Sequence, residues 1–308
     1  MDDVLPKPHR VLALLLKLRY RLAGLGLTKI PGVKFLKGIL QRFSERRGQI
    51  LISCQGCKVY IDPMDVGIVP YLLSDGVYER CTTELFKSLL KPGMVVLDIG
   101  ANFGYYGLIA ARFVGSTGKV YAFEPERKNF RLLVNNVKLN ALANVIPLQI
   151  ALSSENGKAS LFLNKTNLGA HSICQRNVAA VGDVVEIETT TLDNFVQRKM
   201  ETKRVDLIIM DVQGAEGLVI AGADETLRKN DVKILMELWP YGLTNIGTDP
   251  RDLIRKLYGY GFVITVIDEP GPSADLLELV EILENRPDKE AAVNLFLEKV
   301  PSREPVKR

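Results

Sequence analysis

The sequence predicts an α/β fold, a doubly wound and mostly parallel sheet of seven strands with an N-terminal helical and β-hairpin appendage. Two observations lead to this prediction. From residue 95 onward, short apolar runs alternate with amphipathic stretches, which is typical of strand–helix–strand units. The strand-like runs are also apolar throughout, as expected for strands covered by helices on both faces. A chain of 308 residues is long enough to bury such a core.

The predicted strands of the sheet are Val95–Asp98, Lys119–Phe123, Val145–Ile150, Leu207–Met210, Lys233–Leu238, Phe262–Ile267 and Asn294–Glu298. Helical periodicity predicts the intervening helices Tyr105–Phe113, Glu126–Leu139, Ala215–Ala221 and Arg251–Tyr258. One predicted hairpin breaks the alternation, with strands Ala159–Leu163 and Val184–Thr189 around a polar loop at 164–183. Residues 270–290 are acidic and contain proline, so we expect a loop with one helical turn.

Residues 1–62 are predicted to be a basic N-terminal segment, with a leucine-rich helix at 8–27 and a strand pair, Leu51–Ser53 and Val59–Ile61. A helical stretch at 64–90 then opens the main domain, 63–302, and a flexible tail follows at 303–308. We expect the loop 164–183 to be a lid on the acceptor side of the site, because long loops at the mouth of such sheets often carry function.

Residues 1–50 hold 11 Lys/Arg and 3 Asp/Glu, so the basic charge is concentrated there and the rest of the chain is mildly acidic. That distribution argues against a nucleic-acid groove through the main domain. Arg10, Lys17 and Arg21 share one helical face. We favour a solvated face on a helix packed against the domain, and the alternative is peripheral contact with an anionic membrane.

No stretch is apolar enough for a membrane helix and no cleavage signature is evident, so a cytoplasmic protein is expected. Four cysteines in so long a chain fit a reducing compartment. Cys54 and Cys57 form a single C-x-x-C pair, which has neither a second pair nor suitably spaced histidines. We therefore predict inert thiols and no metal site.

The strand that ends in Asp98 is followed by Gly100-Ala-Asn-Phe-Gly104 and a helix. Such glycines let the backbone approach a ligand at a helix N-terminus. A dinucleotide fingerprint counted from Gly100 needs glycine where Asn102 and Tyr105 stand, and the lysine of a P-loop is missing. The Asp98 carboxylate would repel a pyrophosphate but suits an ammonium group, such as that of S-adenosylmethionine.

Glu124 closes the next strand about twenty residues further on, where an acidic side chain accepts hydrogen bonds from ribose hydroxyls. Asp98 and Glu124 together therefore predict an S-adenosylmethionine site. The alternative is a generic αβα domain in which these acidic residues cap helices.

Asp211 and Glu237 also stand at predicted strand ends, so we expect them to face the same crevice. Crowded carboxylates raise one another's pKa, which suits a general base. For Glu216 and Glu237, capping of backbone amides is an equal alternative. His171, in the polar loop, is a third candidate for the acceptor proton, and its alternative is an exposed surface histidine.

The segment from Ile61 to Leu238 resembles the FkbM-type methyltransferases, a branch of the class I S-adenosylmethionine-dependent enzymes. The matching stretches are Asp62-Pro63, Gly76–Glu79, Lys91–Gly93, Val96–Tyr106, Ala122–Pro125, Asn135-Asn136 with Asn140, Ala151–Ser153, Thr191–Asp193 and Asp211–Glu216. The resemblance implies a Rossmann-like methyltransferase sheet and no metal. By position, it implies cofactor contacts at Asp98, Gly100, Asn102, Phe103, Gly104, Glu124, Ala151, Tyr78 and Glu79.

The resemblance further implies O-methylation of a hydroxyl on a sugar, a glycan or a secondary metabolite. Gln213 stands where the family usually has Glu, so it cannot act as a base, and the acceptor stays open. The alternatives are an inactive cofactor-binding or interaction module of the same fold and N-methylation of a small acceptor. An NAD-linked enzyme is disfavoured by Asn102 and Tyr105.

Overall fold

The computed structural model describes residues 49–63, 65–267 and 275–299. The helix predicted at 8–27, the membrane contact expected of it and the tail at 303–308 lie outside these residues. Within the described ranges, no helix combines the length and hydropathy needed to cross a membrane.

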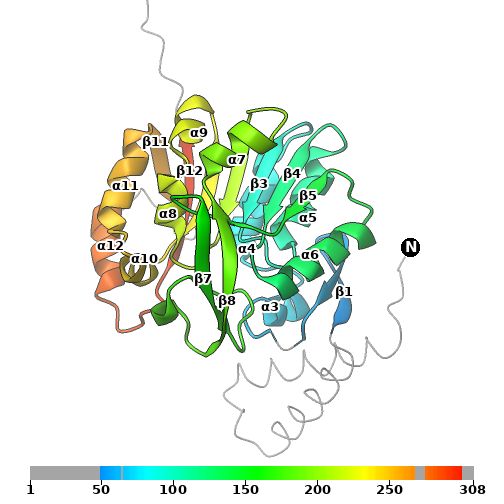
Figure 1. The fold of residues 1–308 in the computed structure, drawn as a ribbon, viewed down its shortest axis with the longest axis horizontal. Helices are drawn as coiled ribbons and strands as arrows, with labels where there is room; N and C mark the ends of the chain where they lie inside the picture. Colours follow the sequence, from blue (N-terminus) through cyan, green and yellow to red (C-terminus); the bar gives the residue numbers. More distant parts are fainter. Residues whose placement is uncertain (1–48, 64, 268–274, 300–308) are drawn as a thin grey trace, which may run out of the picture.

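Seven strands form the central sheet in the order β11-β12-β10-β9-β3-β4-β5 (Figure 1). Their bounds are β3 Val95–Ile99, β4 Lys119–Phe123, β5 Val145–Leu148, β9 Leu207–Met210, β10 Lys233–Leu238, β11 Phe262–Val266 and β12 Val293–Lys299. Only β12 is antiparallel to its neighbours in this sheet. Strand order reverses between β3 and β9, which is where sheets of this kind bind ligands. The predicted seven-stranded, doubly wound sheet is confirmed.

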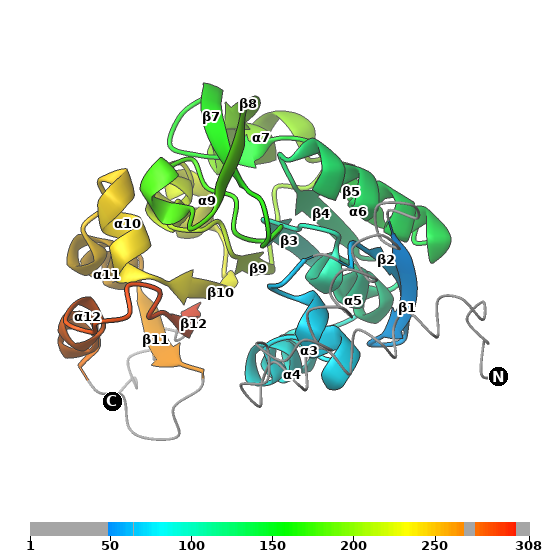
Figure 2. The same ribbon diagram turned by 90° about the horizontal axis from the view of Figure 1, so that it is seen from below.

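Helices cover both faces of the sheet and enclose two separate hydrophobic cores (Figure 2). One face carries α3 Val69–Ser74, α4 Arg80–Leu89, α5 Tyr105–Val114 and α6 Arg127–Leu139. The other carries α7 Leu192–Lys199, α8 Glu216–Ala221, α9 Asp224–Lys229, α10 Pro240–Ile246, α11 Pro250–Gly259 and α12 Leu276–Glu284. Successive strand residues alternate between the cores, since Leu97 faces one and Val96 the other.

The periodicity of the sequence missed three short helices, α7, α9 and α10. The expectation of a loop with one helical turn at 270–290 was wrong, because α12 occupies 276–284. Its buried residues recur every three to four positions, the spacing of an amphipathic helix, at Leu276, Leu279, Val280 and Leu283. Strand β5 ends two residues earlier than predicted, because Ala151–Leu152 forms a separate strand, β6.

The hairpin of β1 (Ile50–Cys54) and β2 (Cys57–Ile61), which the sequence placed in an appendage, packs against α6. Asn136 is fully buried, accepts from the Tyr60 N–H at 2.6 Å and donates to the Tyr60 carbonyl at 3.0 Å. Asn140 makes the same pair of bonds with the backbone of Lys58. The apolar side chains of the hairpin belong to the core that also contains α5, so hairpin and sheet share one core.

Cys54 and Cys57 point into this shared core. Burial raises the pKa of the Cys54 thiol to about 12 and also raises that of Cys57. The thiolate is the reactive form of cysteine, so these shifts support the prediction of inert thiols.

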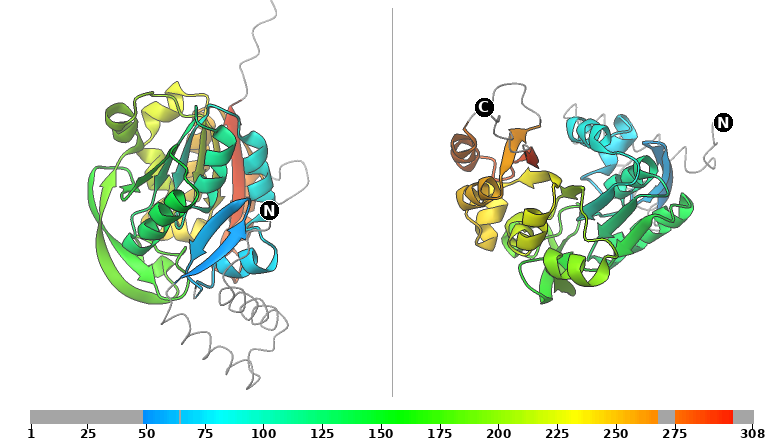
Figure 3. Two further views of the ribbon diagram at one scale, coloured as in Figure 1. Left: turned by 90° about the vertical axis from the view of Figure 1, so that its right-hand side faces the viewer. Right: turned by 90° about the horizontal axis from the view of Figure 1, so that it is seen from above.

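A second sheet, in the order β6-β8-β7, forms an arm beside the central sheet, seen as a long curved ribbon in Figure 3. The predicted hairpin is confirmed, but its strands β7 (Gly157–Asn164) and β8 (Val181–Thr190) are longer than expected. The connecting loop therefore spans 165–180 and contains one 3-10 turn, η2 (Gln175–Asn177). Ser172 in this loop makes two backbone hydrogen bonds with Phe162, at 2.8 and 3.2 Å, which hold the loop against the arm.

Candidate active site

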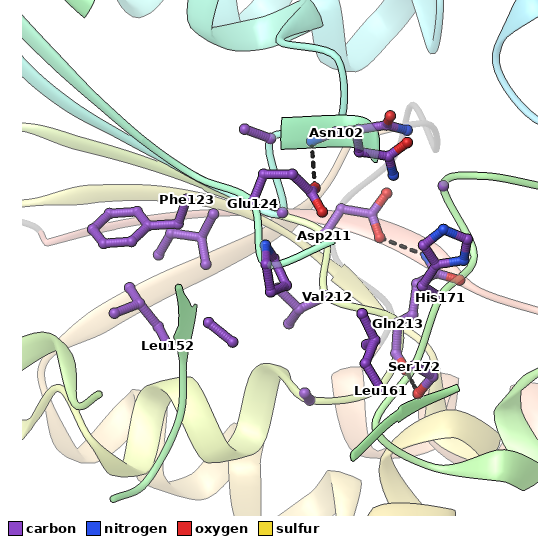
Figure 4. Close-up of a pocket in the computed structure, with 18 of the residues that line it drawn as sticks. Asn102, Phe123, Glu124, Leu152, Leu161, His171, Ser172, Asp211, Val212 and Gln213 are labelled. Carbon is purple, nitrogen blue, oxygen red and sulfur yellow. Dashed lines mark hydrogen bonds between the residues drawn. The ribbon is translucent and has the colours of Figure 1, made fainter. Parts of the chain in front are cut away.

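A pocket lies at the carboxyl ends of β3, β4 and β9, where the strand order reverses. The arm and its loop close it on one side (Figure 4). Eight of the residues predicted from the sequence line it: Tyr78, Asp98, Gly100, Asn102, Glu124, Ala151, His171 and Asp211. Sequence motifs that are far apart in the chain therefore meet in one place.

The loop that follows β3 is held by hydrogen bonds to the end of β4. The N–H groups of Gly100 and Ala101 donate to the Phe123 carbonyl at 3.0 and 2.9 Å. Gly100 has φ +85°, and a Cβ there would lie 2.0 Å from the carbonyl oxygen of Asp211. The glycine thus permits close approach of the β9 end, in addition to any approach by a ligand.

Glu124 is the polar centre of this region and is only 5% exposed. Its Oε2 accepts from the Asn102 N–H at 2.8 Å, and its Oε1 accepts from the Glu126 N–H at 2.8 Å. Burial nevertheless raises its pKa to about 8, because desolvation outweighs these two bonds. Each oxygen retains a further lone pair for a hydroxyl donor.

Asp98, which is 3% exposed, has its pKa raised to about 7 by burial. Its Oδ2 and the Nδ2 of Asn102 are buried and have no hydrogen-bond partner among the described residues. Unpaired buried polar atoms cost roughly 1–3 kcal/mol each, so such atoms at a pocket wall indicate a ligand that pairs with them. A cationic amino-acid group would pair with the Asp98 oxygen.

Apolar side chains also line the pocket, among them Phe123, Ile150, Leu152, Leu161 and Val212. A flat, mostly apolar ring such as adenine suits a wall of this kind. The residues present therefore fit the three parts of S-adenosylmethionine, namely its ammonium group, its ribose hydroxyls and its adenine.

Phe103 and Gly104, which were predicted to contact the cofactor, do not line the pocket. Phe103 is 2% exposed and lies in the hydrophobic core. Gly104 caps the N-terminus of α5 with φ +99°, and a Cβ there would lie 2.7 Å from the Leu133 side chain. Both residues shape the loop that Asn102 occupies, which is a role in folding rather than in contact.

Four acidic side chains gather on the β9–β10 side of the pocket: Asp211, Glu216, Glu237 and Glu79. One oxygen from each of Asp211, Glu216 and Glu237 lies within 4.8 Å of the other two. Glu79 has the left-handed φ of 41° and accepts from the Tyr106 hydroxyl at 3.0 Å. Asp211 lines the pocket, whereas Glu237 and Glu79 are not among its lining residues.

The pKa values of these acids are all raised, and burial is the largest cause for each of them. Those of Glu79 and Glu216 rise to about 7, with Asp211 contributing to both. That of Glu237 rises well above its usual value, by burial and by the charge of Asp211. Glu216 also bonds a backbone amide, as the capping alternative supposed, since its Oε1 accepts from the Val212 N–H at 3.0 Å.

His171 lines the pocket from the arm loop and is not an exposed surface histidine. Its Nδ1 accepts from the Asn164 N–H at 2.9 Å, and burial lowers its pKa to about 4. The ring is therefore neutral near pH 7 with its proton on Nε2, because a backbone amide can only donate.

Gln213, the departure from the family's usual Glu, bonds directly to Asp211. Its Nε2 donates to Asp211 Oδ1 at 2.6 Å (Figure 4). Burial raises the pKa of Asp211, and this bond opposes the rise by favouring the ionised carboxylate. Ser172 donates to the Gln213 carbonyl at 2.9 Å and so links the arm loop to the β9 end.

Sequence reasoning missed several lining residues, including Asn129 of α6. Its Nδ2 donates to the Leu168 carbonyl at 2.8 Å, and its Oδ1 is buried without a partner among the described residues. The one available signal was an asparagine on the buried face of an amphipathic helix.

Residues 98–264 match the family described as the methyltransferase FkbM domain. The chain is 29% identical over 161 residues to the 2-O-methyltransferase NoeI of Sinorhizobium fredii, covering 47% of this chain and 64% of NoeI. It is 28% identical over 176 residues to methyltransferase sdnD of Sordaria araneosa, covering 48% and 68%. The chain thus spans about two thirds of the length of these relatives.

Among solved structures, the methyltransferase FkbM of Methylobacillus flagellatus KT is similar over 75% of this chain and 52% of that chain. The identity is 13% and the TM-score is 0.42. The family match confirms both the family and the S-adenosylmethionine cofactor predicted from the sequence. Because that match covers more than half of the 308 residues, this chain belongs to the FkbM methyltransferase family.

Proposed function

We propose that this chain transfers the methyl group of S-adenosylmethionine to a hydroxyl of a sugar, a glycan or a secondary metabolite. The observation that carries the proposal is the pair of buried carboxylates, Asp98 and Glu124, at the point where the strand order reverses. The name of the relative NoeI, a 2-O-methyltransferase, supports oxygen as the atom methylated.

In this proposal Asp98 holds the ammonium group of the donor, Glu124 accepts from its ribose, and the apolar wall receives its adenine. Opposite charge and hydroxyl donors both favour the ionised carboxylates, which offsets the effect of burial. When bound, the donor supplies a methyl group on a sulfonium that is a good leaving group. The chain then has to align the acceptor and manage one proton.

Asp211 is the best-placed acceptor for that proton among the three predicted candidates. It lines the pocket, and burial raises its pKa towards the range in which a carboxylate is an effective general base. Glu237 lies beside Asp211 without lining the pocket, so we do not propose it as the residue that takes the acceptor proton.

His171 is a weaker candidate for the base, because its Nδ1 accepts from the Asn164 N–H and its Nε2 carries the ring proton. We propose that it donates a hydrogen bond to the acceptor and so orients the oxygen to be methylated. The arm loop that carries His171 would then serve as the acceptor-side lid.

The test is a screen of sugars, glycans, phenols and amines with S-adenosylmethionine, followed by mass spectrometry of the products. A methyl group on oxygen, together with S-adenosylhomocysteine, supports the proposal. A methyl group on nitrogen refutes the O-methylation, and donor binding with no product from any acceptor favours a binding module. Asp211→Asn should abolish turnover while donor binding persists.

A further inference from the structure

We propose that Asp211, Glu216 and Glu237 form a binding site for one divalent cation beside the methyl-transfer pocket. This proposal departs from the sequence analysis, in which both the residues and the family resemblance implied no metal. The three side chains come from adjacent elements: Asp211 follows β9, Glu216 begins α8 and Glu237 lies in β10. β9 and β10 are paired in parallel, which brings their carboxyl ends together.

The spacing of the carboxylates suits a small hard cation. One oxygen from each residue lies within 4.8 Å of the other two. An octahedral cation with bonds of about 2.1 Å separates its oxygen ligands by roughly 3 to 4 Å, so small side-chain rotations would close the site. Carboxylates alone favour Mg²⁺ or Mn²⁺ over the softer metals that select thiolate or imidazole.

Glu216 gives independent support, because one of its oxygens has no partner. The residue is 0% exposed, and its Oε1 accepts from the Val212 N–H at 3.0 Å, which fixes the carboxylate. Its Oε2 is buried and has no hydrogen-bond partner among the described residues. A buried carboxylate oxygen without a hydrogen-bond donor lowers the stability of the fold unless a ligand or a proton pairs with it.

No positive side chain compensates these acids within the part of the chain that the structure describes. The ion pairs found there all involve other carboxylates. Glu79 adds a fourth acid: the charge of Asp211 raises its pKa, and its own charge raises the pKa of Glu237. Buried carboxylates are normally paired or bind metal, and a divalent cation would neutralise most of this charge.

The site also has a place in the reaction, and this part rests on the proposed function. Asp211 belongs both to the acid cluster and to the pocket wall. A cation held there would polarise an acceptor hydroxyl and lower the pKa of its proton. Asp211 would accept that proton on the oxygen that it does not give to the cation, and its Oδ1 also accepts from Gln213 Nε2 at 2.6 Å.

The test is a titration of the chelator-treated full chain with Mn²⁺ at pH 8, without donor or acceptor, followed by electron paramagnetic resonance. Wild type should bind one Mn²⁺ per chain, and Glu237→Gln and Glu216→Gln should each weaken binding by more than about tenfold. The matched control is Glu225→Gln, an exposed carboxylate paired with Lys229 on α9, which should bind like wild type.

Absence of Mn²⁺ binding by wild type, or equal binding by wild type and Glu237→Gln, overturns the site. Circular dichroism identifies a variant that fails to fold, and Glu237→Gln decides the question if the buried Glu216→Gln does not fold. Calorimetry with S-adenosylmethionine on the same samples tests the donor site separately. If the protein binds Mn²⁺ but its rate of methyl transfer is the same with and without Mn²⁺, the catalytic role of the cation is overturned.

Discussion

Replacing Glu124 by Gln should weaken S-adenosylmethionine binding and remove most of its pH dependence. In the ligand-free protein the pKa of Glu124 is about 8, because the side chain is buried. Ribose hydroxyls donate to the ionised form, so binding releases a proton and becomes tighter as the pH rises towards 8. Between pH 6 and 7.5 the cost of ionisation falls by about 2 kcal/mol, or roughly thirtyfold in affinity.

The Gln side chain loses more than charge. Its single oxygen replaces two, and its amide nitrogen cannot accept from the Asn102 and Glu126 amides, each of which now donates to a carboxylate oxygen at 2.8 Å. Those amide bonds form with and without the donor, so their loss lowers stability. The affinity falls because the ribose hydroxyls lose a charged acceptor: hydrogen bonds to charged groups contribute about 1.5–3 kcal/mol each, so the loss of affinity at pH 7.5 should be about 3 kcal/mol, roughly a hundredfold. Asp98, with a pKa of about 7, should leave a smaller pH dependence in the variant.

The measurement is isothermal titration calorimetry between pH 6 and 7.5, in two buffers of different ionisation enthalpy, to count the released protons. The matched control is Asp193→Asn, whose carboxylate accepts from the Glu225 and Thr226 amides at 2.9 and 2.7 Å and does not line the pocket. That variant should lose stability but keep its affinity. Equal affinity and equal pH dependence in wild type and Glu124→Gln would refute the reasoning.

Four further outcomes are expected. Without ligands, the free energy of unfolding in urea should fall as the pH rises from 5 to 8. The buried carboxyls of Asp98, Glu124 and Glu216 have pKa values of about 7 to 8 in the folded protein and about 4 in the unfolded chain, so the folded state binds more protons in this range. The pKa of Glu237 is also raised, so Glu237→Gln should flatten this slope. Gly100→Ala should cost more than about 3 kcal/mol of stability, against about 1 kcal/mol for Gly115→Ala, where nothing lies within 4 Å of the new Cβ; similar losses would argue against the backbone contact. The NMR titration of His171 should have its midpoint near 4, and a midpoint near 6.5 would contradict its burial. Gln213→Glu should raise the pKa of Asp211 and move the acidic limb of the rate profile up by about one pH unit, since it places a like charge against Asp211; an unmoved limb would exclude Asp211 as the base.

The predicted ends of the central strands lie within two residues of the observed ends. This was possible because strands buried on both faces are continuous apolar runs, which local composition shows. The sequence also predicted that Asp98, Glu124 and Asp211 lie in one pocket, since parallel strands end at the same edge of the sheet. It missed α9 and α10, which are six and seven residues long and too short for a clear period.

The contact between Glu216 and Glu237 could not be predicted, because it depends on how a short helix packs beside a paired strand. The same holds for the left-handed backbone of Glu79, Asn102 and Gln213, with φ of 41°, 51° and 53°. Non-glycine residues adopt this conformation only where the surrounding structure imposes it. The residues next to each of these positions therefore do not predict its positive φ.

The two-residue strand β6 has a consequence for how the two substrates bind. Ala151 and Leu152 of β6 line the pocket and pair in parallel with Thr189 and Thr190 of β8. The loop that carries His171 is bonded to β7 in the same small sheet. In the proposed reaction, an acceptor that tilted the arm would therefore also move the wall behind the donor. The affinities for donor and acceptor should be thermodynamically coupled, each changing the other by the same factor.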